Sequence, residues 1–100
     1  MIQYKQLTTR SNNCELKARS IAKTLCSQVS TLDSFESNFR SELAAIPRVN
    51  TSHCSDWYKI ERNGNKIILW HLTAKGDKDR QVAEIIEVNK ENINRSIFGE

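Results

Sequence analysis

The sequence predicts a two-layer α+β domain in which a helical hairpin packs on one face of a small, mostly antiparallel sheet. Residues 56–88 alternate in the manner of three β-strands joined by two turns. Residues 13–46 carry two amphipathic helical stripes, each preceded by a capping pattern. A β-rich run opens the chain, so the expected order is β-α-α-β-β-β, with a short C-terminal helix as a further element.

The first strand is expected over residues 2–7, with Ile2 and Tyr4 on one side. Asn12 followed by Glu15 has the spacing of a capping box, in which side chains satisfy free backbone donors at a helix start. A helix over 13–29 follows, because its apolar residues recur at helical spacing; they are Cys14, Ala18, Ile21, Ala22, Leu25 and Val29.

The second helix is expected to start at a similar cap, formed by Asp33 and Glu36. Its apolar stripe consists of Phe35, Phe39, Leu43 and Ile46. Pro47 ends this helix, because the residue before a proline is pushed out of the α region. Residues 48–55 are polar and predict a loop.

A β-hairpin follows, with Asn63-Gly64 as its expected two-residue turn. This turn would place Trp57 opposite Trp70 and bring Glu61 near Lys66. The face free of Lys and Glu is the expected core face; it carries Tyr58, Ile60, Ile67, Leu69 and His71. After a turn at 75–79, a third strand is expected over 81–88 and a short helix over 89–98.

The other face of the hairpin is the most unusual surface in the sequence, because it carries two tryptophans among charged residues. It could be an aromatic pair that only stabilises the hairpin, or a surface covered by the C-terminal segment. It could also be a partner-binding patch, since exposed aromatic groups edged by charge mark such sites. The candidate protein-binding residues are Trp57, Lys59, Glu61, Ile68 and Trp70.

Length and composition predict one domain over residues 1–100, with enough chain for a single modest core. The formal net charge of +3 permits nucleic-acid contact but does not argue for it. There is no apolar run that could span a bilayer and no secretory h-region at the N-terminus. Three cysteines form an odd, sparse set, which indicates reduced thiols and a cytoplasmic location.

The sequence carries no convincing catalytic, metal or cofactor motif. His53 and Cys54 lack the further ligands that a zinc site needs, and adjacency in sequence does not activate a thiol. Asp77 and Asp79 lie among basic residues, as in a solvated turn, and the three glycines form no phosphate-binding pattern. We therefore expect no metal and no cofactor, and a non-enzymatic role is favoured.

One enzymatic alternative rests on layout. The predicted order of elements resembles that of small bacterial RNA-cleaving toxins of the RelE/ParE type, which position RNA with Lys and Arg. This resemblance implies RNA-directed roles for one end of the second hairpin, where His71, Lys75, Lys78 and Arg80 lie. The same residues also fit a solvated basic turn. Residues 51–100 carry as many acidic as basic residues, which argues against strong binding to RNA phosphates.

The leading hypothesis is a small, non-enzymatic protein-binding domain. Plausible settings are an inhibitor, an immunity or antitoxin-type protein, or an accessory protein of a mobile element. The partner would be another protein or a second copy of this chain, because tryptophans with charged rims concentrate binding energy at interfaces. An RNA-directed protein is the alternative, and a small-molecule site between helices and sheet is the least favoured hypothesis.

Overall fold

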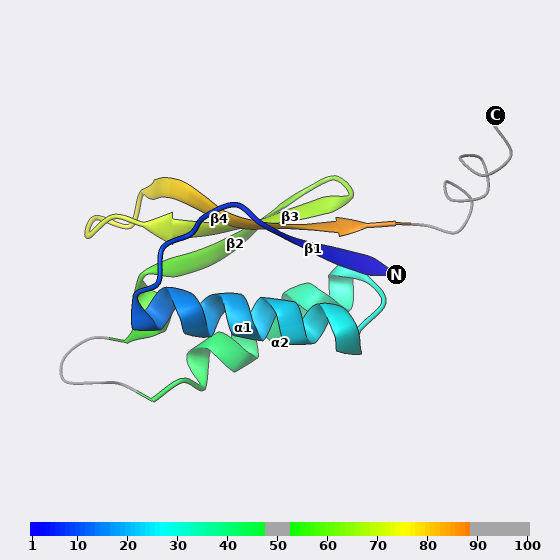
Figure 1. Cartoon of the computed structure of the whole chain (residues 1–100), viewed down its shortest axis with the longest axis horizontal. Coiled ribbons are helices and arrows are strands. Elements are labelled where there is room, and N and C mark those ends of the chain that lie inside the picture. The colour runs from blue at the N-terminus through cyan, green and yellow to red at the C-terminus, as the bar shows by residue number, and fades with distance from the viewer. Residues whose placement is uncertain (48–52, 89–100) are drawn as a thin grey trace, which may run out of the picture.

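The computed structural model describes residues 1–47 and 53–88. Two helices pack on a four-stranded antiparallel sheet in the order β-α-α-β-β-β, which confirms the predicted α+β class (Figure 1). The helix predicted over 89–98 and residues 48–52 of the predicted loop lie outside the described residues. Neither described helix has the length and apolar character needed to cross a membrane.

The sheet has the strand order β1-β4-β3-β2, with every neighbouring pair antiparallel. The strands are β1 (Ile2–Gln6), β2 (Tyr58–Asn63), β3 (Lys66–Leu72) and β4 (Lys78–Glu87). The two ends of this order make β1 and β2 the edge strands. Register shifts between β3 and β4 interrupt the alternation of β4, so the consecutive residues Val82 and Ala83 are both buried.

Helix α1 (Asn13–Gln28) starts as predicted, because the Asn12 side chain accepts a hydrogen bond from the Glu15 backbone N–H at 2.9 Å. Helix α2 (Leu32–Ala44) starts earlier than predicted. Its N-cap is Thr31, whose hydroxyl accepts from the Ser34 backbone N–H at 3.1 Å. The predicted Asp33 cap is therefore wrong; Asp33 lies in the first helical turn, where a negative charge is also favourable.

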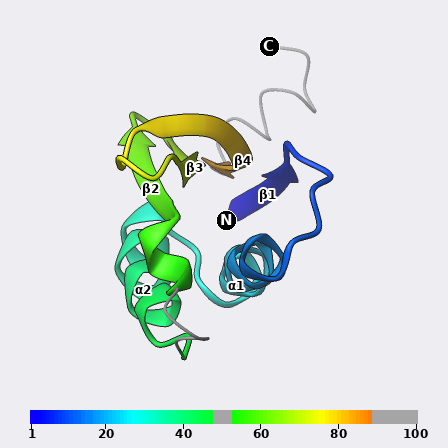
Figure 2. The ribbon, with the colours of Figure 1, turned by 90° about the vertical axis from the view of Figure 1, so that its left-hand side faces the viewer.

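Both helices cover the same face of the sheet, and the core lies between these two layers (Figure 2). Phe35 and Phe39 of α2 stack with ring centroids 5.6 Å apart. The core combines the buried stripes of both helices with the helix-facing residues of the strands: Ile2, Ala18, Ala22, Leu25, Leu32, Phe35, Phe39, Leu43, Tyr58, Ile60, Ile67, Leu69, Val82, Ala83 and Ile85.

The β2–β3 hairpin has a different register from the predicted one. Asn63 pairs with Lys66, so the two loop residues are Gly64 and Asn65, and Gly64 adopts a φ of +61°. A glycine in the first loop position suits a two-residue hairpin turn that needs a positive φ there. Moving the loop by one residue shifts each cross-strand partner by two. The side chains of β2 and β3 therefore keep their predicted faces, but Lys59, not Trp57, lies opposite Trp70.

A disulfide joins Cys14 in the first turn of α1 to Cys54 in a short 3₁₀ helix, η1 (Cys54–Asp56), which precedes β2. The two Cα atoms are 5.2 Å apart, within the range that a disulfide requires. The prediction of three reduced thiols is therefore wrong for this pair, and Cys26 is the free cysteine. Forty residues separate the paired cysteines, so only the folded chain brings them together.

Candidate functional site

The face of the sheet opposite the helices carries four of the five predicted protein-binding residues. Alternation along β2 and β3 places Lys59, Glu61, Ile68 and Trp70 on this outer face. Lys78 at the start of β4 joins them, because its ammonium group lies over the Trp70 ring. We call these five residues the outer patch.

At the centre of the outer patch, Lys78 reaches across β3 to β2. Its Nζ lies 5.1 Å from the Trp70 ring centroid, within the distance of a cation–π contact. The same Nζ donates a hydrogen bond to a Glu61 carboxylate oxygen at 2.7 Å. This hydrogen bond and the ammonium charge lower the pKa of Glu61. Trp70 itself is half-buried, so the patch presents an aromatic ring held between charged groups.

Ile68 lies beneath this charged layer. It is only 3% exposed although it does not belong to the core cluster between sheet and helices. Its cross-strand neighbours are Glu61 on β2 and Glu84 on β4, and Glu84 pairs with Lys66 at 3.8 Å. The predicted Glu61–Lys66 pair is therefore wrong, because each residue has a different partner on β4.

Trp57 does not join the outer patch. It directly precedes β2, where its backbone N–H bonds to the Cys54 carbonyl and its own carbonyl accepts from the Leu72 N–H at 2.8 Å. Its side chain is half-buried and packs against the core cluster. The structure thus separates the two tryptophans that the predicted register placed opposite each other.

The four predicted RNA-binding residues are divided between the two faces of the sheet. His71 pairs with Arg80 across β3 and β4 on the helix-facing side, whereas Lys78 belongs to the outer patch. Arg80 bonds to a buried carboxylate, and His71 Nδ1 lies 3.1 Å from an Asp79 carboxylate oxygen. Lys75 is exposed in the turn between these strands. The residues therefore do not converge on a single basic surface.

Sequence reasoning missed a buried ionic cluster centred on Glu15. This residue has 0% exposure, and Arg80 donates a hydrogen bond to each of its carboxylate oxygens, one of them at 2.9 Å. The Tyr58 hydroxyl donates to the same carboxylate at 2.9 Å. Burial alone would raise the pKa of Glu15, but the hydrogen bonds from Arg80 and Tyr58 lower it below its ordinary value. Burial and the bond to Glu15 raise the pKa of Tyr58 to about 12.

The signal for this cluster was present in the helical spacing. Glu15 lies on the same buried stripe as Ala18, Ala22 and Leu25, at offsets of three, seven and ten residues. A carboxylate on a buried stripe needs a charged or hydrogen-bonding partner. The capping-box interpretation assigned the Glu15 side chain to the helix start. It therefore gave no reason to look for a partner such as Arg80.

A surface hollow of about 410 Å³ lies beside this cluster, where α1 begins. Its lining residues are Asn12, Asn13, Cys14, Trp57, Tyr58 and His71. The His71 ring meets the Tyr58 ring edge-on, with centroids 5.3 Å apart. Cys14 is held in the disulfide and Tyr58 is bonded to Glu15, so the hollow presents no free nucleophile from the described residues.

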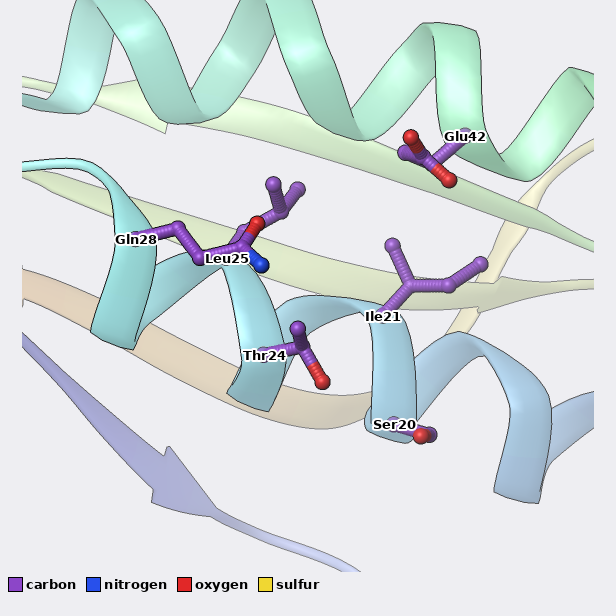
Figure 3. Close-up of a pocket in the computed structure, with 6 residues that line it drawn as sticks. All are labelled: Ser20, Ile21, Thr24, Leu25, Gln28 and Glu42. Carbon is purple, nitrogen blue, oxygen red and sulfur yellow. The ribbon is translucent and has the colours of Figure 1, made fainter.

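Two further hollows lie along α2. One, of about 300 Å³, lies between the two helices, and Figure 3 shows side chains from both helices around it. It is lined by Ser20, Ile21, Thr24, Leu25, Gln28 and Glu42, which offer a single carboxylate and no histidine. The other, of about 410 Å³, lies between α2 and β2 and is lined by Phe39, Arg40, Leu43, Ser55, Tyr58, Lys59 and Ile60.

Within residues 1–47 and 53–88, no three His, Cys, Asp or Glu side chains gather so that they could hold a metal ion. Comparisons with known protein families, with curated proteins and with solved structures gave no significant match.

Proposed function

We propose that this chain is a small, non-enzymatic protein-binding domain that contacts its partner through the outer patch of Lys59, Glu61, Ile68, Trp70 and Lys78. The observation that carries the proposal is the position of Trp70. Both helices cover the opposite face of the sheet (Figures 1 and 2), and Trp70 remains half-buried on the outer face among charged side chains. An aromatic anchor with a charged rim is the usual composition of an interface centre and its border.

The charged groups of the patch suit recognition of a specific partner. Lys59 is exposed and forms no ion pair with another described residue, whereas Lys78 and Glu61 are held in place by each other. A partner that supplies a carboxylate would pair with Lys59, and its apolar surface would cover Trp70. Roles as an inhibitor, an immunity or antitoxin-type protein, or a mobile-element accessory protein all require such a surface.

The RNA-directed alternative receives less support from the geometry, because Arg80 is bonded to Glu15 and Lys78 to Glu61. A cytoplasmic location also stays a proposal. The Cys14–Cys54 bond weighs against it, because disulfides persist mainly in oxidising compartments.

The test is affinity capture from the native cell extract with the full chain and with Trp70→Ala. We expect the wild type to retain a specific polypeptide, and the purified polypeptide to bind Trp70→Ala more weakly by more than about 1 kcal/mol. Lys5→Ala is the matched control, since Lys5 is an exposed residue on the distant edge strand β1.

Circular dichroism must show that Trp70→Ala is folded. Unfolding of this variant would mean that Trp70 stabilises the sheet and would remove the main support for the proposal. Labelled RNA is added in a parallel binding assay. A salt-sensitive shift that is lost when Lys75, Lys78 and Arg80 are replaced by Ala would favour the RNA-directed alternative.

A further inference from the structure

Strand β2 is an edge of the sheet, and the described residues leave its outer side unpaired. It pairs with β3 on one side only, and no described backbone group bonds to its other side. An edge strand of this kind presents a row of N–H and C=O groups to which another strand can pair.

The ladder to β3 determines which residues face outward. The Leu72 N–H donates to the Trp57 carbonyl at 2.8 Å, so these two residues form a hydrogen-bonded pair. Hydrogen-bonded and non-bonded pairs alternate along an antiparallel ladder, so Lys59 and Glu61 also direct their backbone groups toward β3. The backbone groups of Tyr58, Ile60 and Arg62 therefore point away from the sheet, into the free edge.

The hollow between α2 and β2 lies along this same edge. Tyr58, Lys59 and Ile60 all line it, although their side chains alternate between the two faces of the sheet. Three consecutive strand residues can border one hollow only along the edge of the strand. The opposite wall belongs to α2 and consists of Phe39, Arg40 and Leu43, so the hollow keeps this helix apart from the edge of β2.

We propose that two copies of this chain associate by antiparallel pairing of their β2 strands about a two-fold axis at Ile60. In this register the three outward-facing residues of one copy bond to the three of the other. Lys59 of each copy then lies directly opposite Glu61 of its partner on the outer face, and opposite charges in this position stabilise strand pairing. The two outer patches join across the new sheet.

Charge excludes the neighbouring symmetric registers. Centring the two-fold axis on position 59 would place two lysines opposite each other, and centring it on position 61 would oppose two glutamates. Like charges directly opposite each other destabilise strand pairing. Of these three registers, only the one at Ile60 pairs Tyr58, Ile60 and Arg62 together and also places opposite charges across from each other on the outer face. This inference rests on the proposed role in protein binding and names one partner, a second copy.

The test is the mass of the purified full chain by light scattering and sedimentation over a range of concentrations. The wild type should be a dimer. Lys59→Glu and Glu61→Lys should each weaken the dimer by about tenfold or more, because two attractive cross-strand pairs become repulsive. Mixing the two variants should restore a dimer, since each position 59 again faces a position 61 of opposite charge. Lys5→Glu, the same reversal on the other edge strand, should leave the wild-type mass unchanged.

A wild type that stays monomeric would overturn the pairing, and so would a mixture of the two variants that fails to dimerise. A dimer that survives both single reversals but is lost in Trp70→Ala would also overturn it and would place self-association on the outer face instead. The capture of a different polypeptide through Trp70 is measured separately, so failure of the β2 pairing leaves the proposed function standing. Circular dichroism of each variant confirms that a lost dimer is not a lost fold.

Discussion

Arg80 on β4 donates hydrogen bonds to both carboxylate oxygens of Glu15 on α1, and Glu15 is fully buried. This contact ties the first helix to the last described strand, 65 residues later in the chain. The Tyr58 hydroxyl donates a hydrogen bond to one of the same carboxylate oxygens, so β2 is bound to the cluster as well. Beside it, the Cys14–Cys54 disulfide fixes the start of α1 to the segment that leads into β2.

Arg80→Ala should lower the free energy of unfolding by about 3–5 kcal/mol, because it leaves the Glu15 charge buried without a partner. Arg62→Ala is the matched control. Arg62 also bonds to a carboxylate, at 2.6 Å, but its partner Asp33 is 86% exposed, so this loss should be about 0–1 kcal/mol. Urea unfolding followed by circular dichroism measures both. Equal losses in the two variants would show that Glu15 is not buried as an ion.

Glu15 should also make the protein sensitive to acid. Its pKa is lowered by folding, so its contribution to stability is fully present above its ordinary value of 4.5 and is lost as the pH falls through the folded-state pKa. Glu15→Gln has no charge to protonate. The difference in unfolding free energy between wild type and Glu15→Gln should therefore shrink as the pH is lowered below about 4.5. Parallel pH profiles for the two proteins would contradict this expectation.

The disulfide should contribute about 2–4 kcal/mol to stability, because it closes a loop of 40 residues and restricts the unfolded chain. Urea unfolding with and without a reductant, compared with the Cys14→Ser/Cys54→Ser double variant, measures this contribution. Cys26→Ser should keep the full response to the reductant, since Cys26 is free.

Thiol counting gives an independent check on the disulfide. In denaturant the unreduced protein should react at one thiol, and after reduction at all three cysteines. Denaturant is needed because burial raises the pKa of the Cys26 thiol to about 11, so little thiolate forms in the folded protein. Three reactive thiols without prior reduction would show that Cys14 and Cys54 are not joined.

The fold was predictable because its elements follow from local patterns. Helical spacing placed α1 within one residue of its observed bounds, and strand alternation assigned the side chains of β2 and β3 to the correct faces. Trp57 is the exception, because it precedes β2 and packs against the core cluster. The start of α2 was less predictable, since Thr31 and Asp33 are both good capping residues and lie two positions apart. The choice between them depends on the path of the chain after α1. Short-range residue spacing carries no information about that path.

The long-range contacts could not be predicted from local patterns. Arg80 meets Glu15, and Cys54 meets Cys14, only because the sheet order brings β4 and the start of β2 to the same end of α1. Each of these residues also had a plausible local interpretation, as a helix cap, a basic turn residue or a reduced thiol. The outer patch was partly predicted, because the faces of β2 and β3 were correct, but Lys78 reaches it from a strand whose place in the sheet was unknown.

The observed hairpin register gives a last prediction. Gly64→Ala should destabilise the protein by about 1–2 kcal/mol, because Gly64 has a φ of +61° and a residue with a Cβ is strained there. No heavy atom lies within 4 Å of the added Cβ, so steric contact contributes nothing to this loss. Asn63→Ala is the control and should cost about 0.5 kcal/mol or less, because Asn63 is an exposed strand residue paired with Lys66. Thermal unfolding measures both, and a larger loss for Asn63→Ala would support the alternative turn at Asn63-Gly64.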